Sequence, residues 1–189
     1  MPLWAAILSR WLLGEAITRS RVLGMLLGLS GLAVLIGPDL ATVADHPAGS
    51  LFMLAAAWGW ATGTVLVKKG PWNMPLIAVT AWMFLLGGAP IVAASFLWGD
   101  WGSLAGLSGH ALLVWGYVIA LPMLFCHWGY YRVVTIFPVS LAALAMLIAP
   151  VVGVISGAWF LGEPLGLAEV GSLALVVAGL GVVLLRPRR

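Results

Sequence analysis

The sequence predicts an all-α fold, a polytopic membrane helical bundle built from two inverted repeats of five helices. Three observations lead to this prediction. First, 63% of the 189 residues are hydrophobic and only 8% are charged, whereas soluble domains carry about 25% charged residues. Second, long apolar segments recur along the whole chain. Third, the pattern that joins the last two segments also occurs at the start of the chain, so the sequence contains an internal repeat.

The apolar segments are separated by short connections rich in glycine, proline, aspartate and serine, which are typical of loops. Every segment after the first reaches the length of roughly 20 residues that a helix needs to cross a bilayer. The first has only about twelve residues, fewer than a spanning helix needs. In order, the segments are 2–13, 20–37, 50–67, 75–97, 111–131, 138–161 and 167–185.

The repeat relates the start of the chain to its last third at a constant offset of 148 residues. Pro2, Trp11, Gly14 and Glu15 recur without a gap as Pro150, Trp159, Gly162 and Glu163. Apolar residues match often by chance in such a composition, but a proline, a tryptophan and a Gly-Glu pair in register do not. We therefore expect Gly14-Glu15 and Gly162-Glu163 to form equivalent turns.

The charges predict the topology of the segments. If the first segment runs toward the cytoplasm and the segments alternate, every lysine and arginine falls on the cytoplasmic side, as short loops require. These residues are Arg10, Arg19, Arg21, Lys68, Lys69, Arg132, Arg186, Arg188 and Arg189. Asp39, Asp45, Asp100, Glu163 and Glu169 fall on the opposite side, and Glu15 is the acidic exception. The net charge of +3 is thus explained by topology, and a nucleic-acid partner is not expected.

The same topology places the two Gly-Glu turns on opposite faces, so the repeats are inverted. Residues 50–187 form a complete second repeat of five helices, residues 1–37 form the last two helices of the first repeat, and residues 38–49 form an extracytoplasmic loop. Since 49 − 148 is −99, we expect about 100 residues, or three helices, to precede Met1. Inverted repeats are a recurrent architecture of secondary transporters.

The order of these motifs resembles the EamA-type proteins of the drug/metabolite transporter superfamily. The resemblance rests on the proline-centred helix followed by Leu-Gly-Glu and a glycine-rich last helix, and on the segments that precede them. These are Trp58–Thr64 before Lys68-Lys69, Trp82–Pro90, and His127–Arg132 before Pro138. The resemblance implies a ten-helix carrier of two repeats that exports small metabolites or drugs from the cell. It also implies a location in the plasma or inner membrane and a cytoplasmic C-terminus.

Prolines near the middle of three successive segments, Pro90, Pro122 and Pro150, allow two interpretations: cavity-lining breaks or helix bending for packing. Pro150 is favoured for function because Pro2 repeats it, and it is expected to free the carbonyl of Met146. In segment 50–67, Gly59 and Gly63 are expected to serve close helix packing. Trp60 and Thr64 would then face either a central cavity or lipid.

The candidate substrate-pathway residues are Trp60, Thr64, Tyr117, His127, Tyr131 and Pro150. The aromatic stripe that includes Tyr117 and Tyr131 is also explained by packing, and His127 by a hydrogen bond near the interface. Glu15 and Glu163 could couple transport to protons. Their places at segment ends favour an architectural role, capping the N-terminus of the following helix.

The sequence contains no metal-ligand spacing, cofactor motif or catalytic set, so we expect neither an enzyme nor a cofactor. Two alternatives to a carrier stay open. One is a non-transporting fragment or half-protein that needs a partner chain; the other, a membrane-embedded enzyme, lacks the polar constellation that it would need. A homo-oligomer and a missing N-terminal half are both compatible with the sequence, and the substrate is left undefined.

Overall fold

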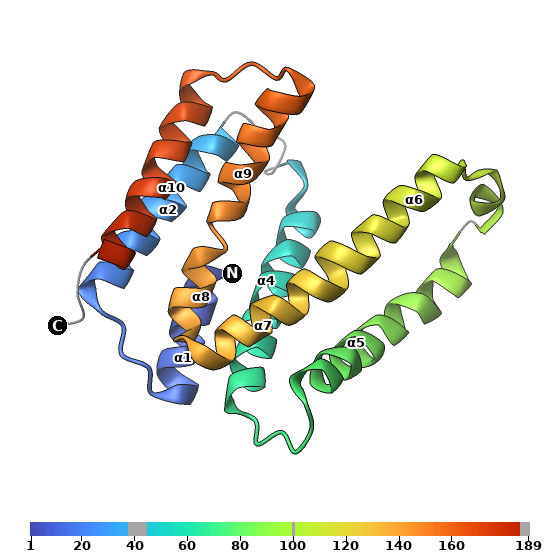
Figure 1. Ribbon diagram of the computed structural model, residues 1–189, viewed down its shortest axis with the longest axis horizontal. Helices are drawn as coiled ribbons and strands as arrows, with labels where there is room; N and C mark the ends of the chain where they lie inside the picture. Colours follow the sequence, from blue (N-terminus) through green and yellow to red (C-terminus); the bar gives the residue numbers. More distant parts are fainter. Residues whose placement is uncertain (38–44, 100, 186–189) are drawn as a thin grey trace. The chain divides into compact units, whose positions relative to one another are not determined.

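The computed structural model describes residues 1–37, 45–99 and 101–185, and the regular secondary structure in these ranges is helical (Figure 1). Six helical spans in this part of the chain are long and apolar enough to cross a membrane. They are α2 (Arg19–Ile36), α4 (Pro47–Lys69), α5 (Leu76–Trp98), Gly109–Ile136, Val139–Leu161 and α10 (Leu167–Leu185). The predicted polytopic helical bundle is confirmed.

Two of these spans are composites, and a shorter helix begins the chain. The span Gly109–Ile136 consists of α6 (Gly109–Val118), the π-helix η3 (Ile119–Cys126) and α7 (His127–Ile136). The span Val139–Leu161 consists of α8 (Val139–Ala145), α9 (Ile148–Ser156) and the π-helix η4 (Gly157–Leu161). α1 covers Pro2–Leu13, and η2 (Trp101–Gly106) is a short 3₁₀ helix.

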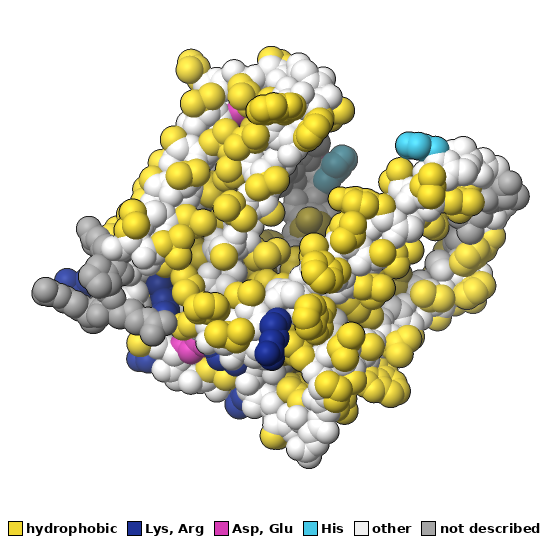
Figure 2. Space-filling model, in the orientation of Figure 1, with side chains coloured by type: hydrophobic (Ala, Val, Ile, Leu, Met, Phe, Trp, Pro, Cys, Tyr) yellow, Lys and Arg dark blue, Asp and Glu magenta, His cyan; other side chains and the backbone are white. Residues whose placement is uncertain are grey.

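The helices form two compact units. Unit 1 comprises Met1–Lys69 and Phe137–Arg189, and unit 2 comprises Gly70–Ile136. Within unit 2, α7 runs back along α5, and the two helices form an antiparallel pair (Figure 1). Within unit 1, α2 packs along α10, and α1 packs on α4 and α8 (Figure 1). Hydrophobic side chains cover the visible sides of the helices (Figure 2), as expected for surfaces that face lipid.

One buried cluster in the core of unit 1 joins the beginning and the end of the chain. Its buried side chains come from α1, α2, α8, α9, α10 and the short link between α8 and α9. They are Ala6, Met25, Leu144, Leu147, Val151 and Val176. The two helices of the predicted first repeat are therefore packed into the second repeat.

Glycines bring α2 and α10 into backbone contact. A Cβ atom at Gly179 would lie 2.8 Å from the carbonyl oxygen of Gly24. A Cβ atom at Gly31 would lie 2.8 Å from the carbonyl oxygen of Ser172. Both distances are shorter than an ordinary contact, so only glycine permits this approach, as in other small-residue helix interfaces of membrane proteins.

These contacts obey the offset of the sequence repeat. Adding 148 to 24 gives 172, and subtracting 148 from 179 gives 31, so the contact Gly24–Gly179 is the repeat-related copy of Gly31–Ser172. The two helices are also antiparallel (Figure 1). An approximate two-fold relation between the repeats would produce this reciprocity, which supports the prediction that they are inverted.

The two Gly-Glu turns have the same backbone geometry. Gly14 has φ 67° and ψ 16°, and Gly162 has φ 68° and ψ 23°, a left-handed conformation that glycine adopts without strain. The N–H of Glu15 donates to the Ser9 carbonyl at 3.2 Å, and the N–H of Glu163 donates to the Gly157 carbonyl at 3.4 Å. Both acceptors precede their glutamate by six residues, so the sequence repeat is also a repeat of local structure.

Candidate functional site

Polar contacts at one end of unit 1 join the two predicted repeats. The Oε1 atom of Glu15 lies 3.0 Å from Nζ of Lys68, at the end of α4. The same oxygen accepts a hydrogen bond of 3.0 Å from the backbone N–H of Val139, the first residue of α8. Lys68 also donates to the carbonyl of Phe137, just before α8. One carboxylate thus holds the ends of three helices, and we call this end the basic end.

Arg21 adds a second link at the basic end. Its guanidinium donates to the carbonyl of Ala16 at 2.8 Å and to Oγ of Ser140 in α8 at 3.0 Å. Glu169, near the start of α10, lies at the opposite end of unit 1, because α10 runs antiparallel to α2 (Figure 1). The predicted charge separation is therefore present for these residues. Asp39, Asp100, Arg186, Arg188 and Arg189 lie outside the described residues.

Glu15 was expected to cap the following helix, and the structure shows a different arrangement. Thr18 caps the following helix, α2, by accepting from the N–H of Arg21 at 3.4 Å. Glu15 instead binds the N-terminus of α8, far away in the sequence, where a helix dipole favours a carboxylate. The Glu163 carboxylate lies over Gly157 in the helix before it, so in the described structure it does not cap the following helix.

The electrostatics of the basic end combine a shielded ion pair with one unsatisfied oxygen. The side chains of Lys68 and Glu15 are 24% and 13% exposed, so their pair is less screened than a surface pair worth about 0.2–1 kcal/mol. The second carboxylate oxygen, Oε2 of Glu15, is buried without a hydrogen-bond partner in the described structure. A buried oxygen without a hydrogen-bond partner opposes the attraction of the ion pair, so the contact is not fully satisfied.

The helix that carries Pro150 is interrupted before the proline. Helix α8 ends at Ala145 and α9 begins at Ile148. The carbonyl of Met146, which was expected to be free, accepts a hydrogen bond of 3.1 Å from the N–H of Ala149. The expectation was wrong because the chain tightens into a three-residue turn, which keeps this carbonyl bonded while it relieves the clash with the proline ring.

The link between α8 and α9 is seated on α2. A Cβ atom at Gly28 would lie 2.4 Å from Cδ1 of Leu147, the second residue of the link. Gly28 therefore provides the space in which the break lies. Pro122 also sits in altered backbone, the π-helix η3, whereas α5 remains an α-helix through Pro90. The three prolines are therefore not structurally equivalent. The π-helix around Pro122 is of interest because such segments occur frequently at functional sites.

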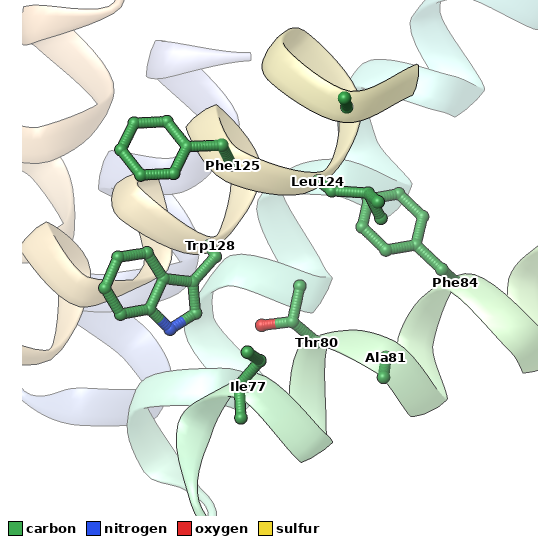
Figure 3. Close-up of a pocket in the computed structure, with 8 residues that line it drawn as sticks. Ile77, Thr80, Ala81, Phe84, Leu124, Phe125 and Trp128 are labelled. Carbon is green, nitrogen blue, oxygen red and sulfur yellow. The ribbon is translucent and has the colours of Figure 1, made fainter. Parts of the chain in front are cut away.

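Unit 2 contains an apolar pocket of about 500 Å³ between α5 and the η3–α7 segment (Figure 3). Its lining residues are Ile77, Thr80, Ala81, Phe84, Ala120, Leu124, Phe125 and Trp128. The hydroxyl of Thr80 donates to the carbonyl of Leu76 at 2.9 Å and is therefore already bonded within its helix. Without a charged side chain in its lining, this pocket suits an uncharged apolar or aromatic molecule.

An aromatic cluster lies in the same unit. The ring of His127 is 4.9 Å from that of Phe84 and 5.1 Å from that of Tyr131, which in turn lies 5.6 Å from Tyr130. Separations of this size are typical of favourable aromatic pairs. The structure thus brings together two of the predicted pathway residues, His127 and Tyr131, while Tyr117 in α6 is 60% exposed.

The predicted arrangement of α4 requires correction. Thr64 is fully buried and its hydroxyl donates to the Trp60 carbonyl at 2.9 Å, so it faces neither a cavity nor lipid. A Cβ atom at Gly59 would meet nothing within 4 Å in the described structure, so this glycine does not serve close packing. Trp60 is 40% exposed. The packing motif lies instead in α2, where the spacing of Gly24 and Gly28 was a signal that sequence reasoning missed.

Residues 47–185 match the EamA-like transporter family. The chain belongs to this family. The match begins with the first residue of α4 and ends with the last residue of α10, so the EamA region contains all five spans of the predicted second repeat. No solved structure matches the chain significantly.

Three relatives of this EamA protein illustrate the similarity, and two of them are named as a transporter or an efflux pump. It is 36% identical to a WAT1-related chloroplastic protein of Arabidopsis thaliana, over 51% of this chain and 24% of the relative. It is 26% identical to the uncharacterized transporter YvbV of Bacillus subtilis, over 96% of this chain and 59% of the relative. It is 28% identical to a probable amino-acid metabolite efflux pump of Salmonella typhimurium, over 92% of this chain and 60% of the relative. The chain thus spans less than two thirds of each of these relatives.

Sequence reasoning identified Glu15 in this EamA chain but missed its partners. Lys68 and Arg21 were noted only for their place in the topology. The signal that could have found them is the predicted topology itself, which already placed Glu15 on the side of all the cations. The roles of the predicted pathway residues stay predictions.

Proposed function

We propose that the protein is a membrane carrier that exports small metabolites or drugs by alternating access between inverted repeats. In this proposal it lies in the plasma or inner membrane, and the basic end of unit 1 faces the cytoplasm, as lysine and arginine near the ends of spans require. Transport would need no cofactor, because the helices would change their positions during the cycle and no chemical reaction would take place.

One observation carries this proposal: the EamA match covers five membrane-capable spans without interruption. The reciprocal contacts between α2 and α10 support the inverted repeat, and alternating access is the motion for which inverted repeats are suited. One relative of the chain is named as a probable amino-acid metabolite efflux pump, which favours small metabolites as the substrate class.

The proposed substrate pathway uses the interrupted helix. The break at Met146–Leu147 and the proline that follows it give the span Val139–Leu161 two segments that can tilt separately. Trp60 and Pro150 in unit 1, and Tyr117 and His127 in unit 2, remain the proposed lining residues, and the buried Tyr131 is proposed to support the ring of His127. Thr64 supports Trp60 through the backbone and is proposed as a packing residue.

An efflux measurement tests this function. Cells expressing the natural full-length protein are loaded with a panel of labelled amino acids, aromatic metabolites and amphipathic drugs, and the retained label is followed. Pro150→Leu removes the proline beside the break, and Pro90→Leu serves as the matched control, because Pro90 lies in an uninterrupted α-helix.

Three outcomes are informative. Faster loss of at least one compound than in cells without the protein, abolished by Pro150→Leu and kept by Pro90→Leu, would support the carrier and its broken helix. Efflux that survives both substitutions would remove Pro150 from the mechanism. A correctly inserted full-length protein that moves no compound of the panel would contradict export as its function.

A further inference from the structure

The polar links between the predicted repeats in unit 1 converge on the basic end. Glu15 and Arg21 belong to the first repeat, and their partners Lys68, Val139 and Ser140 belong to the second. Each link joins the connection between α1 and α2, or the start of α2, to the end of α4 or the start of α8. Together they connect these helix ends to one another.

A groove lies at the opposite end of two of these helices, α2 and α4. Between the end of α2 and the start of α4 lies an almost entirely apolar groove of about 730 Å³. Its lining residues are Leu32, Ile36, His46, Gly49, Ser50, Met53 and Leu54. Helices α2 and α4 are therefore tied through Glu15 at one end of unit 1 and separated by a groove at the other. An alternating-access carrier requires an asymmetry of this kind in each of its two states.

The chemistry of the link suits a contact that opens and closes. A carboxylate at a helix N-terminus and a shielded ion pair both favour the closed state. Against them, Oε2 of Glu15 is buried without a partner in the described structure, which costs free energy in the closed state. Favourable and unfavourable terms that oppose each other leave a small difference between two states, which is what a switching element needs.

We propose that Glu15 and Lys68 form the cytoplasmic gate of the carrier. The ion pair and the bond from Glu15 to the N-terminus of α8 close the gate, and their rupture lets the end of α4 and the start of α8 move away from α1 and α2. Glu15 and Lys68 are positioning residues, since they act through α8 and its Pro150-bearing continuation. The inference rests on the proposed alternating access.

Cysteine accessibility in the full-length protein tests the gate without any substrate. Val139 is fully buried at the gate and Ser172 is 4% exposed, near the start of α10 at the opposite end. Each is replaced by cysteine in a Cys126→Ser background, and a membrane-impermeant maleimide is added from the cytoplasmic or the external side. Lys68→Met opens the proposed gate. Lys69→Met is the matched control, since Lys69 is exposed and lies outside these contacts.

The gate predicts different behaviour at the two reporters. Lys68→Met is expected to raise cytoplasmic labelling of Val139→Cys about fivefold or more over Lys69→Met, and to leave labelling of Ser172→Cys unchanged or lower. Lys68→Arg is expected to restore slow labelling. Equal rates in Lys68→Met and Lys69→Met would overturn the gate. So would faster labelling at both reporters, because that would show general loosening of the helices.

A second variant covers the case in which Lys68→Met fails to enter the membrane. Glu15→Gln keeps the shape of the side chain and an acceptor for the N–H of Val139 but removes the charge, and the same rise at Val139→Cys alone is expected. Slow labelling in Glu15→Gln would then overturn the gate. Because accessibility requires no transported compound, a working gate in a protein that exports nothing would separate this inference from the proposed function.

Discussion

The glycine contact between α2 and α10 yields a sharp prediction for the Gly179→Ala variant. A Cβ atom at position 179 would lie 2.8 Å from the carbonyl oxygen of Gly24 and 3.2 Å from the backbone nitrogen of Gly28. Both neighbours are backbone atoms of a helix, which cannot turn aside as the end of a side chain can. The two helices must therefore separate by about half an ångström to restore an ordinary carbon–oxygen contact of roughly 3.3 Å.

The magnitude follows from two opposing terms. Overpacking of a tight interface costs about 1–3 kcal/mol, while replacement of glycine by alanine inside a helix gains about 1 kcal/mol. Gly181→Ala is the matched control, because Gly181 lies in the same helix and its added Cβ would meet nothing within 4 Å in the described structure. The gain is common to both variants, so Gly179→Ala should be less stable than Gly181→Ala by about 2 kcal/mol.

Thermal unfolding of the detergent-solubilised protein, followed by size-exclusion fluorescence, measures this difference. A loss of about 2 kcal/mol corresponds to a midpoint lower by about 4–8 °C in a chain of this length. Equal midpoints for Gly179→Ala and Gly181→Ala would refute the close backbone contact, and with it the reciprocal interface that supports the inverted repeat.

Three further predictions concern the turns and the pocket. Glu15→Gln should lower the unfolding free energy by about 1–2 kcal/mol through loss of the ion pair, whereas Glu163→Gln should change it by less than about 0.5 kcal/mol; equal losses would contradict the unequal roles of the two turns. Gly162→Ala should cost about 1–2 kcal/mol at its positive φ, while Gly153→Ala in α9, where a Cβ is free of contacts within the described structure, should not destabilise the protein; both are measured by the same melting experiment. Trp128→Ala should weaken binding of an apolar naphthalene fluorophore about fivefold to tenfold in a fluorescence titration, and unchanged affinity would exclude the unit 2 pocket as its site.

The repeat shows why some local features could be predicted and others could not. Gly14 and Gly162 were expected to form equivalent turns. A left-handed residue at a helix C-terminus favours glycine, and this preference depends only on the local sequence. The destination of the Glu15 carboxylate was not predictable in this way. Thr18 caps α2, and the approach of α8 gives the Glu15 carboxylate a different helix N-terminus to bind.

Helix packing was the least predictable part of the fold. Gly59 and Gly63 have the spacing of a packing motif, as do Gly24 and Gly28, and a sequence does not say which pair meets another helix. Close approach requires a matching small residue on the partner, which Gly179 in α10 supplies for α2. In the same way, Pro150 was expected either to break or to bend its helix, but the break at Met146–Leu147, its hydrogen bonds and its contact with Gly28 depend on how α2 packs.

The sequence by itself determined that this protein is a polytopic membrane bundle, where its spans lie, and that it resembles EamA-type transporters. Whether a segment inserts into lipid depends on its own composition and length, and these do not depend on the helices that pack beside it. Only the tertiary structure decided that Glu15 meets Lys68 and α8, that Thr64 is buried, and that glycines join α2 to α10. Those contacts depend on helices that are distant in sequence, and a side chain's partner is fixed only when the helices have packed.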